Sequence, residues 1–470
     1  MWRGFMLAGR MSELEYLNQY YEQKGSRMLV VYGQKHIGKT TLVRAFAEDK
    51  PNYYYLAKPC SEREQMYQWG IQLKAYERND PDKDDGICLP DGKDFPEFAD
   101  IFNAVSVSTG KRVIIIDEFQ NIVKVSESFM QELVAFIRKQ EEKGGVMVLL
   151  CSSSIGWIEN SMITKIGEAA YALSGLLKIR ELSFGDIVHR FPNFRIEECV
   201  EAYAILGGIP GLWNQFDDKL TIQQNICRHI LNPDSLLFEE GERMVADQLR
   251  ETSVYNTILA AIAAGKHKLN DIYRHTEFSR AKISVYLKNL MELELVEKVF
   301  SYDGAGKENA QKGIYRIIHP FVEFYFTYMY PYMSMLQTIS VGEYYNTYIY
   351  PNFRKYVSGC FKKVCRQYLE KLNERGKLPI HFESSGEWVG KDGSIDLIAK
   401  DAEGRTLIAL CNWEKPMMTY ADYEWVISCA ERARIKADYI YLYTASGFDE
   451  KLNLEAKIKK NLKLVQVSDV

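Results

Sequence analysis

The sequence predicts an α/β protein that is built around a parallel sheet and carries smaller modules after it. Three observations lead to this prediction. A glycine-containing loop lies between an apolar strand and an amphipathic helix, and a continuous β-branched run ends in two carboxylates. The chain of 470 residues is also too long for one hydrophobic core, so roughly two to four domains are expected.

The composition narrows the class of protein. Hydrophobic residues make up 47% of the chain and charged residues 26%, as in ordinary folded proteins. The formal charge of −4 gives no overall attraction for nucleic acid, so any such binding requires a local basic patch. The nine cysteines show no C-x-x-C spacing and the seven histidines do not cluster, which argues against a zinc site and for reduced thiols.

No membrane segment is expected. The N-terminal residues lack the cleavage signature of a signal peptide. The most apolar run, Phe321 to Leu336, contains Glu323 and Pro331 and is too short for a span, so it is predicted as a buried aromatic helix. We therefore expect a cytoplasmic protein without a membrane partner.

The glycine-containing loop is the strongest functional signal. Gly33 to Thr40 fit the pattern G-x-x-x-x-G-K-T, in which glycines let successive backbone N–H groups turn around a phosphate at a helix N-terminus. Lys39 is expected to bridge the β and γ phosphates, and the Thr40 hydroxyl to ligate Mg²⁺. The residues predicted to contact the nucleotide here are Gly33, Gln34, Lys35, His36, Ile37, Gly38, Lys39, Thr40 and Thr41. No guanine-reading motif is apparent, which favours ATP over GTP as the nucleotide.

The β-branched run Arg112 to Ile116 predicts a strand buried on both faces, with Asp117 and Glu118 at its carboxyl end. Open α/β sheets place their ligands at this edge. Asp117 is predicted to hold Mg²⁺ through water, and Glu118 to accept a proton from the attacking water as the general base.

Three further residues are weaker candidates. After strand Val146–Leu150, Ser153, or otherwise Ser152, is placed to sense the γ-phosphate, although a plain serine turn explains this segment equally well. Pro210 lies among small residues that allow adenine to pack closely, or it simply breaks a helix. Arg10 either reaches the nucleotide or pairs with Glu13.

With these segments in order, the chain resembles the archaeal-type ATPases, a P-loop group near the AAA+ and STAND ATPases. The segments that carry the resemblance are Gly9-Arg10 with Glu13-Leu14, Gly33 to Thr41, Ile116 to Gln120, Cys151 to Ser154 and Gly207 to Pro210. The resemblance implies a helical lid in which Pro210 lies against the base. It also implies an arginine soon after the serine tip, where this chain has Leu176, so hydrolysis is expected to be slow unless Arg180 or another subunit substitutes.

Residues 249 to 319 predict a winged helix-turn-helix. Helical spacing from Tyr255 to Ala264 is followed by a second helix with Asn270 as its N-cap and a third with Ser279 as its cap. Two strands then flank a loop that contains Lys307 and Lys312. If the module binds DNA, the third helix presents Arg280, Lys282 and Lys288 to it. Nearby acidic residues thin out the basic surface that DNA binding requires, and a winged helix used only for protein contacts would look the same. DNA contact is therefore the less favoured interpretation.

Residues 351 to 470 resemble the domain of unknown function that usually ends these ATPases, a relative of the PD-(D/E)XK nucleases. Such a nuclease needs carboxylates for Mg²⁺ and a lysine to orient water. Here Lys362 stands where the family has glutamate, and Leu410 and Asn412 replace the glutamate and lysine of its central strand, which leaves only Asp396. We predict that this domain does not cut nucleic acid. Three tryptophans, Trp388, Trp413 and Trp425, are expected in its core.

The expected organisation is an α/β P-loop core with a helical lid, then the winged helix and the nuclease-like domain. The boundaries expected are 1–182 for the core, 183–248 for the lid, 249–319 for the winged helix, 320–350 for an aromatic linker and 351–470 for the last domain. The function expected is Mg²⁺-dependent ATP hydrolysis coupled to movement of the winged helix. The alternatives are an ATP-loaded interaction switch with negligible turnover, working with a protein partner or by self-association, and a DNA-binding ATPase.

Overall fold

The chain forms two compact units in a computed structural model, which describes residues 9–79, 96–106, 110–247, 249–300, 313–390 and 393–469. The first unit spans Met1–Glu181 together with Ile209–Gly211. The second spans Leu182–Gly208 and Leu212–Val470. The short segment Ile209–Gly211 therefore leaves the surrounding helical region and packs with the first unit.

The first unit contains a five-stranded sheet in the order β2-β3-β4-β1-β5, and every neighbouring pair is parallel. Its strands are β1 (Arg27–Tyr32), β2 (Asn52–Leu56), β3 (Arg112–Asp117), β4 (Val146–Ser152) and β5 (Gly175–Lys178). Its helices are α2 (Met11–Glu22), α3 (Lys39–Ala47), α4 (Glu62–Asn79), α5 (Phe98–Ala104), α6 (Gln120–Val123), α7 (Phe129–Gln140), η1 (Glu141–Lys143), α8 (Ile155–Asn160), α9 (Met162–Ile166) and η2 (Gly167–Ala172). The parallel α/β prediction is confirmed.

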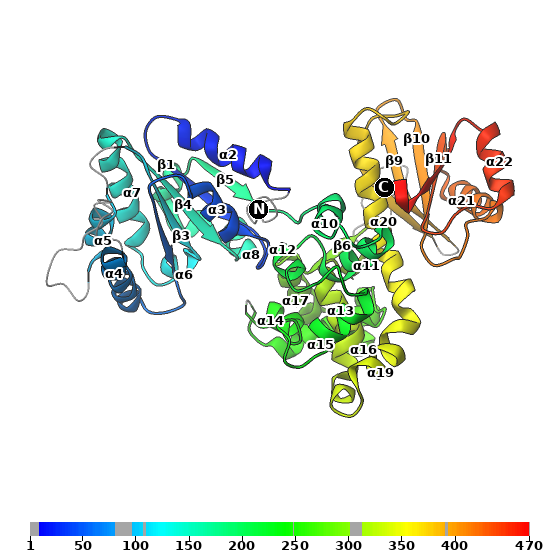
Figure 1. Ribbon diagram of the computed structural model, residues 1–470, viewed down its shortest axis with the longest axis horizontal. Helices are drawn as coiled ribbons and strands as arrows, with labels where there is room; N and C mark the ends of the chain where they lie inside the picture. Colours follow the sequence, from blue (N-terminus) through cyan, green and yellow to red (C-terminus); the bar gives the residue numbers. More distant parts are fainter. Residues whose placement is uncertain are drawn as a thin grey trace. The chain divides into compact units, whose positions relative to one another are not determined.

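Burial on both faces explains the composition of the central strands. Every residue of β3 and β4 is buried, because α2 and α3 cover one face of the sheet and α5 and α7 the other (Figure 1). The second face is closed by aromatic side chains, among which Trp69 stacks on Tyr55 with 4.0 Å between ring centroids. In the register, Tyr32 pairs with Ser152 and Ile116 with Leu150, so β1, β3 and β4 end at one common edge.

The second unit begins with helices and a winged helix-turn-helix. The helices are α10 (Phe184–Arg190), α11 (Ile196–Leu206), α13 (Ile222–His229) and α14 (Glu240–Ala246), while α12 (Pro210–Trp213) starts in the segment assigned to the first unit. The winged helix comprises α15 (Thr252–Ala263), α16 (Leu269–Thr276), α17 (Arg280–Glu292), β6 (Val296–Val299) and β7 (Ile314–Ile317). The predicted three helices and hairpin are confirmed.

Of the two helix caps predicted in the winged helix, one is confirmed and one is wrong. Ser279 caps α17, because its Oγ accepts a hydrogen bond of 3.2 Å from the backbone N–H of Lys282. Asn270 does not cap α16, since the extended N-cap residue is Lys268 and Asn270 lies inside the helix. Its side chain instead accepts a hydrogen bond from Arg280. Lys307 and Lys312, predicted on the loop of the hairpin, lie outside the described residues.

The predicted buried aromatic helix, Phe321 to Leu336, is confirmed only in its first part. The segment is buried from Phe321 to Met329, whereas most residues from Tyr330 to Met335 are exposed and the backbone is non-helical at Tyr332. The aromatic region after the winged helix comprises α18 (Pro320–Phe324), η4 (Tyr325–Met329), η5 (Tyr330–Gln337), α19 (Val341–Tyr344) and η6 (Tyr345–Ile349). Phe321, Phe324 and Met329 have no exposed surface, although Tyr330 lies at the protein surface. Among the helices of the described ranges, none has the length and apolar character needed to cross a membrane.

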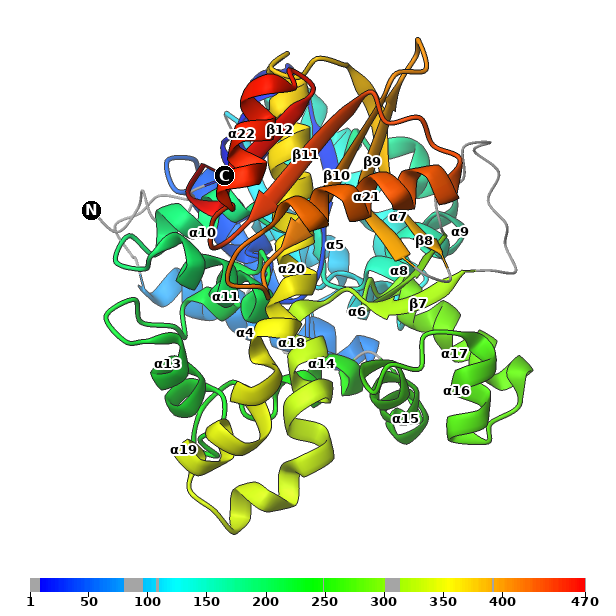
Figure 2. The same ribbon diagram turned by 90° about the vertical axis from the view of Figure 1, so that its right-hand side faces the viewer.

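The chain ends in a second five-stranded sheet, in the order β12-β11-β10-β9-β8. Its elements are α20 (Tyr350–Glu374), β8 (Phe382–Gly390), β9 (Gly393–Asp401), β10 (Thr406–Asn412), α21 (Tyr420–Ala433), β11 (Tyr439–Thr444), α22 (Glu450–Ile458), β12 (Leu462–Gln466) and η7 (Val467–Asp469). The helices α20 and α21 cover opposite faces of the sheet (Figure 2). This is the separate α/β domain that the sequence predicts.

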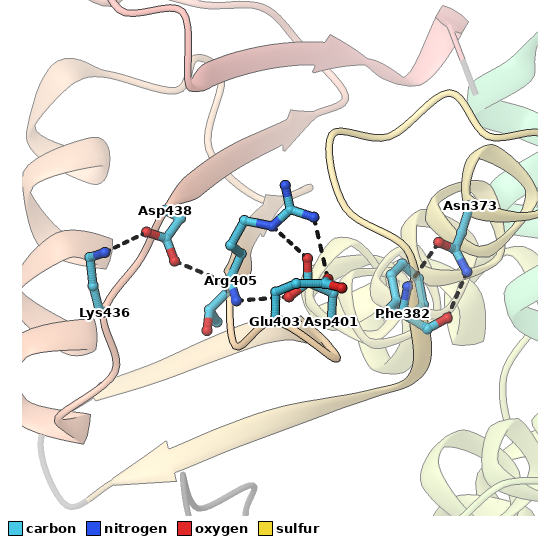
Figure 3. A network of polar contacts seen from close by, with 8 residues as sticks. Asn373, Phe382, Asp401, Glu403, Arg405, Lys436 and Asp438 are labelled. Atoms are coloured by element: carbon cyan, nitrogen blue, oxygen red, sulfur yellow. Dashed lines mark hydrogen bonds and ion pairs between the residues drawn. The ribbon is translucent and has the colours of Figure 1, made fainter.

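Polar contacts fix the connections of this sheet (Figure 3). The Asn373 side chain donates to the Phe382 carbonyl at 2.8 Å and accepts from its N–H at 3.1 Å, which joins the end of α20 to β8. Arg405 donates to Asp401 at 2.7 Å across the β9–β10 turn.

The prediction that the tryptophans of this domain lie in its core is correct for Trp413, which is 3% exposed. It is wrong for Trp425, which is 46% exposed and packs under the Arg432 guanidinium.

Candidate nucleotide-binding site

The loop between β1 and α3 requires glycine at both ends. Gly38 is the N-cap of α3 with φ of 94°, a left-handed conformation that residues with a Cβ resist. At Gly33 the reason is space, since a Cβ would lie 2.5 Å from the Ile179 carbonyl oxygen. The loop therefore turns tightly and leads directly into the N-terminus of α3, the arrangement that favours an anion.

Lys39 lies across this loop. Its Nζ donates to the carbonyl oxygens of Gly33 at 3.0 Å and Gln34 at 2.8 Å, and its side chain is almost completely buried. Burial lowers the pKa of Lys39, while the neighbouring carboxylates of Glu118 and Asp117 act in the opposite direction. The cation is thus held between the loop and the acidic end of β3.

Asp117 joins three elements at the common edge of the sheet. Its Oδ2 accepts hydrogen bonds from the Thr40 hydroxyl and from the Tyr54 hydroxyl, both at 2.8 Å. Burial and the Asp117 carboxylate raise the pKa of Tyr54, so this phenol stays protonated and donates. A hydroxyl and a carboxylate are oxygen ligands of the kind that Mg²⁺ prefers, so Thr40 and Asp117 fit that ion. The sequence analysis missed Tyr54, whose partner lies on another strand.

Glu118 is held in place by two neighbours. Its Oε2 accepts hydrogen bonds from the Ser153 hydroxyl at 2.8 Å, the Ser153 N–H at 3.2 Å and the Gln120 side chain at 2.5 Å. Its φ of 54° is uncommon for a non-glycine residue. Ser152, the alternative candidate, is completely buried and accepts from the Ser154 N–H, whereas the Ser153 hydroxyl donates to Glu118. Gln120 was not singled out from the sequence.

The remaining residues of the loop differ in exposure. Gln34, Lys35 and Thr41 are half-buried, Ile37 is buried and His36 is exposed. Arg10 makes the expected ion pair with Glu13 at 2.9 Å and also donates to the Ile37 carbonyl of the loop at 3.1 Å, while its contact with the nucleotide stays a prediction.

Pro210 lies beside the loop as well. An ideal Cβ on Gly38 would be 4.0 Å from Pro210 Cγ. The next residue, Gly211, donates its backbone N–H to the His36 carbonyl at 3.0 Å. A Cβ on Gly211 would lie 2.7 Å from His36 Cβ, so glycine is needed for this close approach. The sequence had indicated small residues around Pro210 but not their contact with His36.

Two other sets of residues singled out in the sequence are exposed. Leu176 on β5 and Arg180 beyond it are both exposed. The three cations proposed for nucleic acid are also exposed, but each has a partner nearby: Arg280 lies over Tyr273, Lys282 over Phe278, and Lys288 pairs with Glu292 at 3.8 Å.

A phosphate loop after β1, a lysine across it and a threonine–aspartate–glutamate cluster at the edge of a parallel sheet define a P-loop ATPase. Over residues 7–216 the sequence matches an ATPase domain predominantly from Archaea, so this part of the chain is an archaeal-type ATPase domain. Residues 256–298 match bacterial regulatory proteins of the arsR family, and residues 325–425 match archaeal and bacterial proteins of unknown function.

Individual proteins are similar over different lengths. An uncharacterised protein of Methanocaldococcus jannaschii is 28% identical over 410 residues, which cover 87% of this chain and 88% of that protein. An uncharacterised ATP-binding protein of the same organism is 33% identical over 45 residues, or 10% of this chain and 76% of its own length. Among solved structures, the Walker-type ATPase of Pyrococcus abyssi aligns with a TM-score of 0.49 and 16% identity, over 68% of this chain and 95% of that one.

Proposed function

We propose that this protein hydrolyses ATP with Mg²⁺ and couples its nucleotide state to movement of the winged helix. The loop from Gly33 to Thr41 binds the phosphates, and Lys39 neutralises charge on them. Thr40 and Asp117 hold Mg²⁺, which supplies electrostatic stabilisation of the transferred phosphoryl group. Glu118 accepts the proton of the attacking water, and Ser153 senses the γ-phosphate.

The position of Glu118 is the observation that carries this proposal. The carboxylate lies at the end of β3, next to the Mg²⁺ candidate Asp117, and is oriented by Ser153 and Gln120. A general base must be positioned in this way before it can deprotonate water. The test is steady-state ATP hydrolysis by the full chain, with Mg²⁺ and with Mg²⁺ withheld. Turnover that depends on Mg²⁺ would support the proposal.

The second candidate is an ATP-loaded switch with negligible turnover, which acts through a protein partner or by self-association. It is favoured by Leu176, where the resemblance implies an arginine, because such a group contributes about 10³–10⁵ to the rate. Tight Mg-ATP binding without turnover would establish the switch. Turnover that appears only when the protein self-associates would assign the missing arginine to another subunit.

The contact of Gly211 with the phosphate loop gives a first prediction. In Gly211→Ala the new methyl group would lie 2.7 Å from His36 Cβ and 2.9 Å from the His36 carbonyl oxygen, so the segment 209–211 must move away. We expect ATP affinity to fall about tenfold, since one backbone hydrogen bond and the contact of Pro210 are lost together. Equilibrium titration with a fluorescent ATP analogue measures this.

Gly359→Ala is the matched control, because nothing lies within 4 Å of that position inside α20. This control is expected to keep its ATP affinity and to gain slight stability. Equal ATP affinities of Gly211→Ala and the wild type would show that the segment 209–211 does not contribute to nucleotide binding.

The DNA-binding alternative is supported by the match to the arsR family and by the exposure of Arg280 and Lys282 on α17. If it holds, Arg280→Ala/Lys282→Ala weakens duplex binding, and the slope of log affinity against log salt falls by about two, one for each lost phosphate contact. Fluorescence anisotropy with a labelled duplex at several salt concentrations is the measurement. A wild-type protein that binds no duplex at low salt would exclude this alternative.

We also propose that the nuclease-like domain does not cut nucleic acid. Within the described ranges, no three His, Cys, Asp or Glu side chains are grouped so that they could hold a metal ion. The lysine that would orient water is replaced by Asn412, whose amide donates to Thr444 at 3.5 Å.

A further inference from the structure

The residues around Asp396 do not fit a divalent cation, because the Lys362 ammonium already pairs with the Asp396 carboxylate. Lys362 on α20 places its Nζ 2.5 Å from Asp396 Oδ1, and the Cys411 N–H donates to Asp396 Oδ2 at 2.9 Å. Both oxygens of this carboxylate, which is only 4% exposed, are therefore occupied. An ammonium in direct contact with the carboxylate repels a metal ion from the same oxygen atoms.

A second buried carboxylate beside this pair also has a cation partner. Glu387 lies on β8 at a bulge opposite the Ile395–Ile398 stretch of β9, and it acts electrostatically on Lys362. Its Oε1 is 2.7 Å from the Arg316 guanidinium. Arg316 comes from β7 of the winged-helix hairpin, where it is paired in register with Glu297.

Burial makes these partners necessary. A carboxylate removed from water without a counter-charge is costly, and two such groups close together are more so. In a metal-dependent nuclease fold the ion supplies that counter-charge. Here Lys362 supplies it to Asp396 and Arg316 supplies it to Glu387.

We propose that the nuclease-like site of this chain has become an ion-pair junction, in which Lys362 replaces the metal and Arg316 ties the winged-helix hairpin to the sheet. The four residues belong to α20, β7, β8 and β9 of the second unit (Figure 2). The domain then serves to hold the winged helix through this junction rather than to bind a divalent cation. This inference does not depend on ATP hydrolysis, since no residue of the phosphate loop takes part.

The first test is Mn²⁺ binding to the full-length, nucleotide-free protein, followed by electron paramagnetic resonance. We expect Lys362→Glu to gain one bound Mn²⁺ per chain relative to the wild type, and Lys362→Glu/Asp396→Asn to lose it again. Because all three proteins keep the phosphate loop, any ion bound there cancels in the comparison. Wild-type Mn²⁺ binding that Asp396→Asn removes would overturn the replacement of the metal, as would a Lys362→Glu variant that gains no ion.

The second test measures whether the ion pair between Lys362 and Asp396 stabilises the folded domain. Lys362→Met should lower the melting temperature by roughly 3–6 °C, because it leaves Asp396 buried without its partner. In an Asp396→Asn background, Lys362→Met should lower the melting temperature little further. Lys362→Arg, which keeps the positive charge, should retain most of the wild-type melting temperature. Additive effects of Lys362→Met and Asp396→Asn would show that the two residues do not act as a pair.

The link to the winged helix has its own readout, amide hydrogen exchange in β6 and β7. Glu387→Gln should accelerate exchange in this hairpin, because it removes the anion that holds Arg316. The matched control is Glu403→Gln, the same change in a carboxylate of the same domain that is 68% exposed and 3.5 Å from Arg405. Hairpin exchange that is equal in both variants would overturn the tie.

Discussion

Glu118→Gln is expected to reduce ATP turnover by about 10²–10⁴-fold while Mg-ATP binding is retained. The amide oxygen of glutamine can still accept the hydrogen bonds that Ser153 and Gln120 donate to Glu118 at 2.8 and 2.5 Å, so the local structure persists. A neutral amide, however, cannot accept a proton from water. The effect should therefore appear in kcat and not in the dissociation constant of the nucleotide.

The matched control is Glu159→Gln, which neutralises another carboxylate of the same unit. Glu159 is 41% exposed, pairs with Lys178 at 2.8 Å and has no role in the proposed chemistry. We expect turnover in this variant to equal that of the wild type. If Glu118→Gln also hydrolyses ATP at the wild-type rate, Glu118 is not the general base, and any residual turnover has another origin.

Much of the first unit is predictable from sequence because its signals are local. The loop pattern from Gly33 to Thr40 and the run before Asp117 each specify their own strand or helix within about ten residues. Ser279 is likewise a local signal, since a helix cap bonds within its first turn. These segments carry both the fold and the candidate site, so the arrangement of the sheet edge follows from them.

The features that were missed depend on contacts between distant residues. Tyr54 reads as one of three tyrosines in a strand, and only the sheet order places its hydroxyl on Asp117. Trp425 was expected in the core from its hydrophobicity, but its helix turns it toward solvent. The substitution at Lys362 indicated loss of a metal ligand, whereas the structure adds its pairing with Asp396.

Lys39→Ala is expected to lose binding of Mg-ATP, whereas Glu118→Gln is expected to lose turnover. In the structure the Lys39 ammonium bonds to the carbonyls of Gly33 and Gln34, and its side chain is 90% or more removed from solvent. It is therefore already desolvated and oriented toward the loop before a phosphate arrives. Charge-assisted hydrogen bonds contribute about 1.5–3 kcal/mol each. Loss of the two bonds that Lys39 is proposed to make with the β and γ phosphates should therefore weaken Mg-ATP binding by at least about 100-fold.

Thermal unfolding with and without Mg-ATP measures this loss directly. A ligand at about 100 times its dissociation constant adds roughly 2.7 kcal/mol to wild-type stability, and the same concentration should add almost nothing in Lys39→Ala. Lys165→Ala is the matched control, since it removes an exposed lysine of the same unit that lies on α9 outside the phosphate loop, and it should keep the ligand-induced stabilisation. Equal stabilisation of Lys39→Ala and the wild type would mean that the nucleotide binds elsewhere, and the assignment of Gly33 to Thr41 as the phosphate site would fail. Stabilisation lost in Lys39→Ala but kept in Glu118→Gln would instead separate the binding of the phosphates by the loop from the chemistry at the end of β3.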